Sequence, residues 1–340
     1  MVFEKSKNLV GQKMIKKFNL ILYVVISSSI ISANLIHAQE NGFKLNKDEI
    51  SLPVLDNHKF VVNPFTRSPF IKTYFHNSLG FGQALDLQVP IIDINGDPVV
   101  GLRGNLYFIT LDFEYQYAVN DWLAVWMNFG MLSRIGDGVQ TMLAQGINAT
   151  TSLELGWMFR LIETKKTLLS GTINLWNSSG TIINIYDFIQ RIIDEGGISP
   201  DNRMIISRNF LQLGGGFRFA WAASDLIGIN LLTEFAYGES VDRRNENELY
   251  YNFAGSLDLD LNREIEVPIG FAFGMRVNSF IAGSDTSIKN KVGAMFLKIV
   301  YTGQDDFLIG LNLIWRRMPM ATLDQTLYGG SAVLNIDYFF

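Results

Sequence analysis

The fold is decided by the stretch Tyr107-Phe108-Ile109-Thr110-Leu111-Asp112-Phe113-Glu114-Tyr115-Gln116-Tyr117. Its odd-numbered positions are all large and apolar or aromatic, whereas its last three even-numbered positions are Asp112, Glu114 and Gln116. Successive side chains of a β-strand point to opposite faces of the sheet. The stretch is therefore predicted to be a strand with one apolar face and one polar face.

The same period of two recurs along the chain, in residues 153–161, 211–221, 249–261, 269–277 and 307–315. These strands match the roughly 9–11 tilted residues that cross a bilayer. Their apolar faces carry aromatic residues near strand ends, as in the interfacial girdles of a membrane barrel. Those aromatic residues are Tyr115, Tyr117, Trp157, Trp221, Tyr237, Tyr301 and Trp315. A sheet inside lipid must close on itself, because no backbone group can stay unpaired there.

Turns and loops alternate in length between these segments. Short polar turns are expected at 119–121, 163–166, 223–225, 261–264 and 303–306. Longer loops are expected near 92–103, 135–147, 178–204, 239–248, 280–290 and 318–326. This alternation is typical of a barrel with one end in the periplasm and the other outside. We predict an all-β fold, a closed antiparallel transmembrane β-barrel of about 12 strands (range 10 to 14) formed by residues 80–340.

The N-terminus has the pattern of an export signal. Lys13, Lys16 and Lys17 precede an apolar stretch over residues 18–36, and small Ala38 stands at the plausible cleavage position. A basic head, an apolar middle and a small-residue exit describe a secretory signal peptide. Residues 1–38 are therefore predicted to be a cleaved signal peptide, with an uncleaved anchor as the alternative.

Residues 39–79 separate the signal from the predicted barrel. They include Asn63-Pro64-Phe65-Thr66-Arg67-Ser68-Pro69-Phe70, in which two Pro-Phe pairs interrupt any strand. The simpler interpretation is a loose periplasmic leader. The alternative is a hatch inside the lumen, which would be similar to the plugged long-chain fatty-acid transporters.

The chain ends Ala332-Val333-Leu334-Asn335-Ile336-Asp337-Tyr338-Phe339-Phe340, with apolar residues at the even positions 332, 334, 336, 338 and 340. Gly329 or Gly330 stands upstream. This ending resembles the C-terminal assembly signal of Gram-negative outer-membrane β-barrel proteins, which the barrel-assembly machinery reads. The resemblance is to a class and to no specific family. It implies a bacterial cell outer membrane as location, with the assembly machinery and outer-membrane lipid as partners.

No catalytic or cofactor chemistry is apparent. The chain has no cysteine and only three histidines, His37, His58 and His76, and it lacks the common phosphate-binding, zinc-protease and serine-hydrolase motifs. His76 beside Ser78 is the only local Ser–His candidate, and we interpret His76 as a surface or turn histidine. The net charge of −5 gives no reason to expect nucleic acid. We predict no enzyme activity, no cofactor and no metal site.

The polar face of the strands supplies candidate lumen-lining residues. They are Asp112, Glu114, Glu154, Arg160, Arg218, Glu234, Asp258, Asp260, Glu266, Arg276, Lys298 and Arg316, with Asp86 and Asp337 on the same parity. Charges in a narrow interior are costly unless they are paired or hydrated. Two interpretations stay open: a water-filled pore with a slight cation bias, or a salt-bridge network that fills a closed barrel.

The longest loop contains a candidate helix over residues 181–195. Its apolar residues Ile182, Ile185, Tyr186, Ile189 and Ile193 fall at helical spacing, and Gly196-Gly197 supplies a stop. Such an amphipathic helix could constrict the barrel mouth, lie on the outer rim or meet another protein. We predict a channel or transporter for small solutes. The alternative is a structural or surface-binding barrel with a plugged lumen, and an outer-membrane hydrolase is less well supported.

Overall fold

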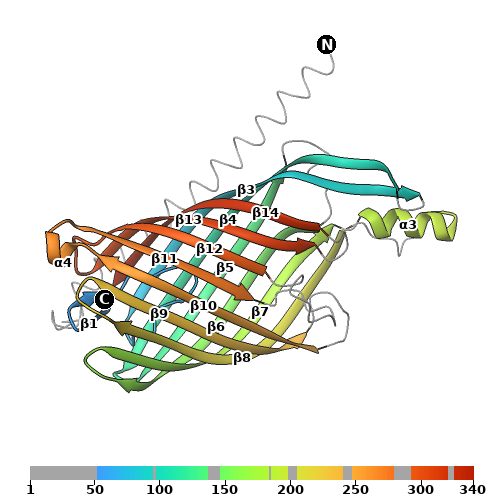
Figure 1. Cartoon of the computed structure of the whole chain (residues 1–340). Helices are drawn as coiled ribbons and strands as arrows, with labels where there is room; N and C mark the ends of the chain where they lie inside the picture. The colour runs from blue at the N-terminus through green and yellow to red at the C-terminus, as the bar shows by residue number, and fades with distance from the viewer. Residues whose placement is uncertain are drawn as a thin grey trace, which may run out of the picture. The chain divides into compact units, whose positions relative to one another are not determined.

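The computed structural model describes residues 52–94, 97–136, 146–183, 185–197, 205–239, 247–278, 292–320 and 325–340. Twelve antiparallel strands form one closed barrel (Figure 1). They are β3 (Tyr74–Ile94), β4 (Asp97–Asn120), β5 (Leu123–Gly136), β6 (Gly146–Glu163), β7 (Thr167–Ile183), β8 (Ile205–Ala222), β9 (Ile227–Glu239), β10 (Asn247–Asp260), β11 (Ile269–Asn278), β12 (Val292–Tyr301), β13 (Phe307–Met320) and β14 (Gln325–Phe339). The pairing of β14 with β3 closes the ring, with Phe339 opposite Tyr74. The predicted fold class and strand number are confirmed.

The five predicted short turns lie at one end of the barrel, which we call the short-turn end. One of them holds the four-residue helix α4 (Asn262–Ile265). The C-terminus lies at the same end, next to the turn between β12 and β13, where Phe339 N–H donates to the Asp306 carbonyl. The opposite end is called the long-loop end. In the described part of the chain, no helix is long and apolar enough to cross a membrane.

The predicted loop at 92–103 is instead a hairpin extension. Strands β3 and β4 stay paired as far as Ile94 opposite Asp97 and project beyond the other strands (Figure 1). The reason is local, since alternation continues through Leu87 and Val89. The turn residues 95 and 96 lie outside the described residues.

The predicted helix is α3 (Ile185–Glu195), and it starts later than expected. Ile182 belongs to β7, where it pairs with Ile147 of β6 and Ile206 of β8. The helical spacing of Ile182 was therefore misleading, because pairing on both sides of β7 keeps the backbone extended to Ile183. Figure 1 shows α3 beyond the strand ends, next to the β3–β4 extension.

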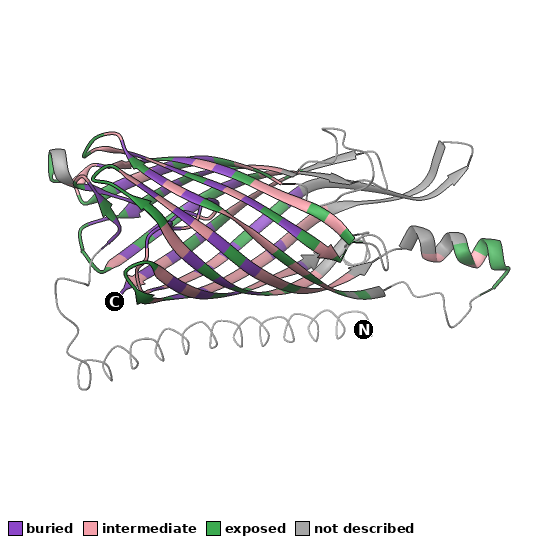
Figure 2. Ribbon diagram, turned by 90° about the horizontal axis from the view of Figure 1, so that it is seen from below, coloured by how far each residue is buried: buried purple, intermediate pink, exposed green. Residues whose placement is uncertain are grey.

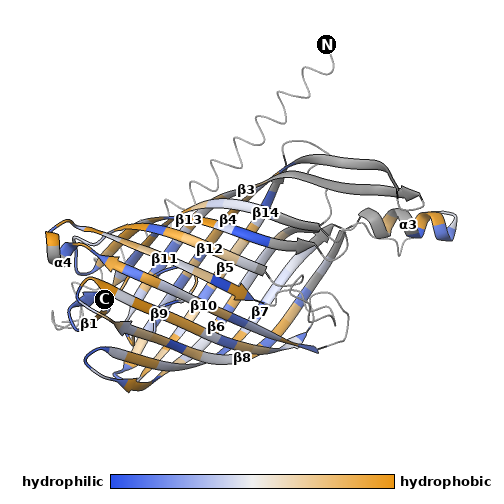
Figure 3. Ribbon diagram, viewed as in Figure 1, coloured by the Kyte–Doolittle hydropathy of each residue, from blue (hydrophilic) through white to orange (hydrophobic). Residues whose placement is uncertain are grey.

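The two faces of the barrel wall differ as the alternation predicts. Along each strand, buried and exposed residues alternate (Figure 2), and apolar residues cover much of the wall (Figure 3). All seven aromatic residues proposed for the girdles point outward, with exposed fractions between 39% and 58%. An exposed apolar band on a closed sheet is the surface that lipid requires.

Residues 52–73 fold into the barrel interior at the short-turn end, and we call them the plug. The plug begins with a small hairpin of β1 (Val54–Leu55) and β2 (His58–Lys59). Its turn residues Asp56 and Asn57 have positive φ values of 43° and 70°, a conformation that Asp and Asn tolerate best among non-glycine residues.

Apolar side chains anchor the plug to the inner wall. Leu52 and Val61 pack with Val300 and Leu308, Phe65 packs with Phe296, and Phe60 and Phe70 pack with Leu168. The interpretation of this region as a loose leader is therefore wrong for residues 52–73. A segment this rich in apolar residues gains more from burial than a solvated leader could. The first barrel strand also starts at Tyr74, before the boundary predicted at residue 80.

Candidate functional site

Barrel side chains hold the plug through its backbone. An extended segment without strand partners leaves its carbonyl groups in need of donors. Lys298 donates to the carbonyl of Val62, Arg218 to Ser68 (3.2 Å), Ser170 to Pro69 (2.7 Å), and Gln116 to both Phe70 and Lys72 (2.8 Å each). Two predicted lumen-lining cations, Arg218 and Lys298, thus bind the plug and are fully buried.

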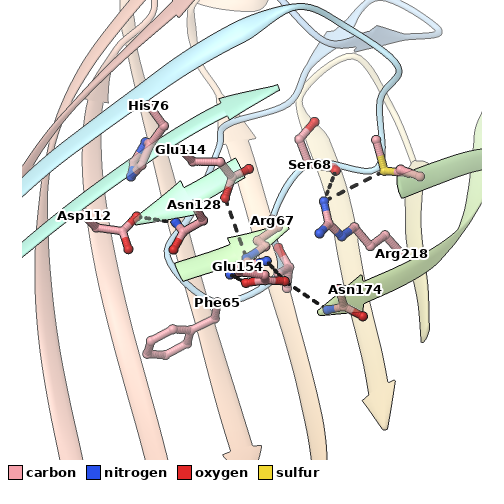
Figure 4. A network of polar contacts seen from close by, with 12 residues as sticks. Phe65, Arg67, Ser68, His76, Asp112, Glu114, Asn128, Glu154, Asn174 and Arg218 are labelled. Carbon is pink, nitrogen blue, oxygen red and sulfur yellow. Dashed lines mark hydrogen bonds and ion pairs between the residues drawn. The ribbon is translucent and has the colours of Figure 1, made fainter. Parts of the chain in front are cut away.

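Arg67 is the plug's charged contact with the wall. Its guanidinium donates two hydrogen bonds to Glu154 of β6, at 2.7 and 2.6 Å, and its Nε lies 3.7 Å from Glu114 of β4 (Figure 4). Burial opposes the charge, but Glu154 and Glu114 outweigh it and hold the pKa of Arg67 above its usual value. Asn174 donates to the same Glu154 carboxylate at 2.9 Å. The predicted residues Glu154 and Glu114 therefore belong to a paired network at the inner edge of the plug.

Arg218 is held from two sides. Its guanidinium lies 4.5 Å from the ring centroid of Trp126, while one nitrogen donates to Ser68 of the plug. Two of its other nitrogens have no hydrogen-bond partner within the described residues. The aromatic face of Trp126 supplies the favourable electrostatic contact that replaces those hydrogen bonds.

The hairpin of the plug contacts the short turns. Asp56 pairs with Lys165 at 2.8 Å and Lys166 at 3.3 Å, and Lys59 pairs with Asp305 at 2.7 Å. These pairs tie the hairpin to two different turns of the wall.

His58 is fully buried at the base of the plug. Its Nδ1 lies 3.1 Å from the carbonyl oxygen of Asp225, so Nδ1 carries the proton, and Nε2 has no partner within the described residues. Burial lowers the pKa of His58, although Asp225 and Asp260 act in the opposite direction. The packing therefore favours the neutral form of His58.

Two more predicted residues, Asp258 and Asp260, lie at the level of the plug. Asp258 accepts from Asn230 at 2.6 Å and from the Val61 backbone at 3.3 Å. Asp260 accepts from Thr302 at 3.1 Å. Both carboxylates are fully buried, so they support the plug and its surrounding wall and do not face an open lumen.

A cavity of about 480 Å³ lies on the long-loop side of the plug. Phe65 and Arg67 contribute to it from the plug, and Trp176 contributes from β7. Six of the predicted lumen-lining residues border it: Asp112, Glu114, Glu154, Glu234, Arg276 and Arg316. None of the described residues of α3 lines this cavity.

Two predicted residues stand apart from both the plug and the cavity. Arg160 is partly exposed near the short-turn end, where it pairs with Glu163. Glu266 is exposed in the turn after α4 with a positive φ of 54°, so its placement on the inner face is wrong. Strand β10 ends at Asp260 and the helical turn α4 follows, which breaks the parity that the prediction assumed. The side chain of Asp86 lies outside the described residues.

His76 lies on the inner wall and is not a surface or turn histidine. It pairs with Asp337 of β14, which also lies 3.7 Å from Lys298. His76 and Ser78 both border the cavity, since residues two apart on a strand share a face. No hydrogen bond joins His76 to Ser78 in the described part of the chain. Across all the described residues, there is no group of three or more His, Cys, Asp or Glu side chains that could hold a metal ion.

Only some side chains of the predicted constriction helix belong to the described residues. The side chains of Ile182, Ile185, Tyr186 and Ile189 lie outside the described residues. Ile193 is exposed, with 61% of its surface accessible. A constricting role for α3 stays a prediction.

Sequence reasoning missed Arg67, Gln116 and Trp126. One sign was present for the plug: residues 52–70 hold Leu52, Leu55, Phe60, Val61, Val62, Phe65 and Phe70, too many apolar side chains for a solvated leader. No local sequence pattern indicates which charged residue of the plug pairs with which strand of the barrel.

Solved barrel structures are similar to this chain at low sequence identity. An outer membrane channel from Pseudomonas putida F1 shares 11% identity, with a TM-score of 0.48, over 83% of this chain and 100% of that one. The NanC porin shares 7% identity, with a TM-score of 0.47, over 77% and 98%. The translocator domain of the autotransporter NalP from Neisseria meningitidis shares 10% identity, with a TM-score of 0.46, over 93% and 98%.

At this identity the likeness extends to the fold alone. The strand pairing of the chain itself shows a closed antiparallel barrel of twelve strands. No family model and no curated protein matches the sequence.

Proposed function

We propose that the chain is a bacterial outer-membrane channel for small solutes, and that the plug closes its lumen at the periplasmic end. The observation that carries this proposal is the cavity of about 480 Å³ that stops at the plug. Its volume falls within the roughly 300–1,000 Å³ of small-molecule sites, and charged and polar groups border it.

The plug has the properties of a removable closure. Among the described residues, none of 52–73 pairs with a strand of the barrel sheet. Between its two ends the plug is held by side-chain hydrogen bonds, ion pairs and apolar packing. Backbone hydrogen bonds to the rest of the barrel occur at the ends, from Leu52 N–H to the Asp305 carbonyl and from Phe340 N–H to the Thr73 carbonyl. The middle of the plug can therefore shift while the sheet stays intact. The void between the plug and Asn230 measures about 10 Å³, room for about one water.

We infer the location of the protein from sequence patterns near its N-terminus and in its last strand. The proposal includes cleavage of residues 1–38 on export, and assembly into the outer membrane through the strand that ends at Phe340. Support comes from the signal pattern at the N-terminus and from β14, which closes the barrel next to that last residue. The short-turn end then faces the periplasm, as is usual for such barrels.

The test is single-channel recording from residues 39–340 refolded into a planar lipid bilayer. The unaltered protein is expected to be almost silent. Arg67→Ala removes the ion pair with Glu154, and Gln116→Leu removes two hydrogen bonds to plug carbonyls without leaving a charge unpaired. Each variant is expected to show discrete conductance steps. Arg160→Ala is the matched control, because this arginine pairs with Glu163 away from the plug.

The rival function is a structural or surface-binding barrel whose interior is permanently filled. The complete burial of Arg218 and Lys298 against the plug favours it. Variants that fold, as heat-modifiable migration in electrophoresis would show, but stay silent in the bilayer would decide for the rival.

A further inference from the structure

The two cavity arginines occupy one row of the barrel wall. Arg276 of β11 is opposite Ala294 of β12, and Ala294 is opposite Arg316 of β13. Neighbouring strands lie about 4.8 Å apart, so the two arginines stand about 10 Å apart with a small residue between them. Both border the cavity. Together they form a basic side of the cavity wall.

Acidic residues occupy the facing side. In the ring of strands, β5 and β11 are six positions apart in either direction, so Arg276 faces β5 across the lumen. The strands flanking β5 carry Asp112 on β4 and Glu154 on β6. Asp112 and Glu154 therefore lie across the cavity from Arg276 and Arg316, as Figure 4 shows for the acidic pair, while Glu234 of β9 lies two strands from Arg276 on the basic side.

The charged residues of the cavity differ in how many hydrogen bonds and ion pairs they form within the protein. Arg67 occupies Glu154 fully, through both carboxylate oxygens. Among the described residues, Asp112 receives one side-chain hydrogen bond, from Asn128 at 2.9 Å. Within the described residues, Arg316 has neither a hydrogen bond nor an ion pair. The acidic and basic sides thus each keep a charge that the protein only partly satisfies.

Glu234 is a second carboxylate of the cavity that can accept a further hydrogen bond. Glu234 is buried beside the cavity, and its Oε2 accepts from Asn252 at 2.8 Å while its Oε1 has no partner within the described residues. Asn252 also accepts from Arg276 Nε at 2.8 Å. A buried carboxylate oxygen without a donor is costly, and a bound cationic group would relieve that cost.

We propose that this cavity binds small zwitterions, with the solute's carboxylate toward Arg316 and Arg276 and its ammonium toward Asp112. This substrate class rests on the proposed channel function. A solute with one charge leaves the opposite wall unpaired, whereas a zwitterion supplies a partner to both walls in one buried space. Phe65 and Trp176 offer apolar surface for the carbon chain between the charged groups.

The test compares four probes with the same four-carbon skeleton by titration calorimetry on the refolded protein in detergent at neutral pH. The probes are 4-aminobutyrate, butyrate, butylammonium and butyramide. We expect 4-aminobutyrate to bind at least about tenfold more tightly than each of the other three, since hydrogen bonds to charged groups at both ends contribute. Equal binding of all four probes, preference for a singly charged probe, or no binding would overturn the inference.

Two variants test which wall of the cavity binds which charged end of the solute. Arg316→Gln is expected to lower the affinity for 4-aminobutyrate to about that for butylammonium, and Asp112→Asn to about that for butyrate. Arg160→Gln, with the same charge change outside the cavity, is expected to leave all four affinities unchanged. Loss of affinity in Arg160→Gln equal to that in Arg316→Gln would overturn the inference.

Trp176 reports the place of binding. It borders the cavity, so 4-aminobutyrate should change tryptophan fluorescence in the unaltered protein and not in Trp176→Phe. The two proposals fail separately. If no probe binds but Arg67→Ala conducts, the zwitterion inference fails and the channel stands. If the probes bind in the expected order but no variant conducts, the channel proposal fails and the cavity is a binding site.

Discussion

Arg67 and Glu154 are joined by two parallel hydrogen bonds, 2.7 Å from Nη1 to Oε1 and 2.6 Å from Nη2 to Oε2, across 87 residues of sequence. One partner lies in the plug and the other on β6 of the wall. This fork-to-fork geometry is the strongest form of ion pair between these side chains. The pair therefore links the position of the plug directly to the charge state of the lumen wall.

Loss of one partner should open the channel more than loss of both. Arg67→Ala leaves Glu154 buried without its cation, which costs roughly 3 kcal/mol or more. The ratio of open to closed time in single-channel records should therefore rise by roughly a hundredfold. The double variant Arg67→Ala with Glu154→Ala should open less than Arg67→Ala alone, because Glu154 is then no longer left buried without its cation.

An exposed pair in the same chain is the control for that cycle. Arg160 and Glu163 have side chains that are 28% and 45% exposed. Replacing either or both by alanine should leave the open-time ratio within about twofold, as for most exposed ion pairs. A large effect at this exposed pair would mean that any loss of charge opens the barrel.

Acid pH should loosen the plug through His58. Burial lowers the pKa of His58 from 6.5, so a released histidine binds a proton in the range just below pH 6.5 while the buried one does not. By linkage, the packed state is fully favoured above pH 6.5 and loses stability as the pH falls from 6.5 toward the lowered pKa. Below that pKa the loss is complete and does not grow further.

Bilayer recordings at successive pH values from 8 to 5 check this prediction. Open time should increase below about pH 6.5 in the unaltered protein. His58→Asn keeps a donor for the Asp225 carbonyl but cannot titrate, so it should flatten the profile. An unchanged profile in His58→Asn would assign the pH response to other groups.

Gly228 leaves room for the base of the plug. A Cβ at this position would lie 2.3 Å from His58 Nε2 and 2.8 Å from the Phe60 ring. Gly228→Ala should therefore displace the hairpin and increase conductance without any change of charge. Gly293→Ala on β12 is the matched control, since its Cβ would meet nothing within 4 Å. Equal conductance of the two variants would show that the contact with His58 does not hold the plug.

Phe340 is predicted to act in assembly. Its backbone N–H donates to the Thr73 carbonyl at 3.0 Å, and neither group belongs to the side chain. Phe340→Ala should therefore refold in detergent as well as the unaltered chain does. In a Gram-negative host its heat-modifiable, folded fraction should fall several-fold. Equal folded fractions in cells would contradict the assembly role.

From the sequence, much of the site could be predicted only as a set of side chains that point into the barrel. Parity placed Asp112, Glu154 and Arg276 on the inner face, and all three border the cavity. Parity could not separate them from Arg218 and Lys298, which have the same alternation but meet the plug. It failed at Glu266, because alternation holds only while a strand continues.

The sequence by itself determined the barrel, since strand alternation, turn length and strand number are local properties that each segment carries alone. Only the tertiary structure decided that the lumen is filled at one end and hollow beyond it. The contacts of the plug join residues far apart in the chain, as Arg67 joins Glu154 and Lys298 joins Val62 across 236 residues. No periodicity encodes such pairs, because they depend on which side chains face the interior at the same height once the ring has closed.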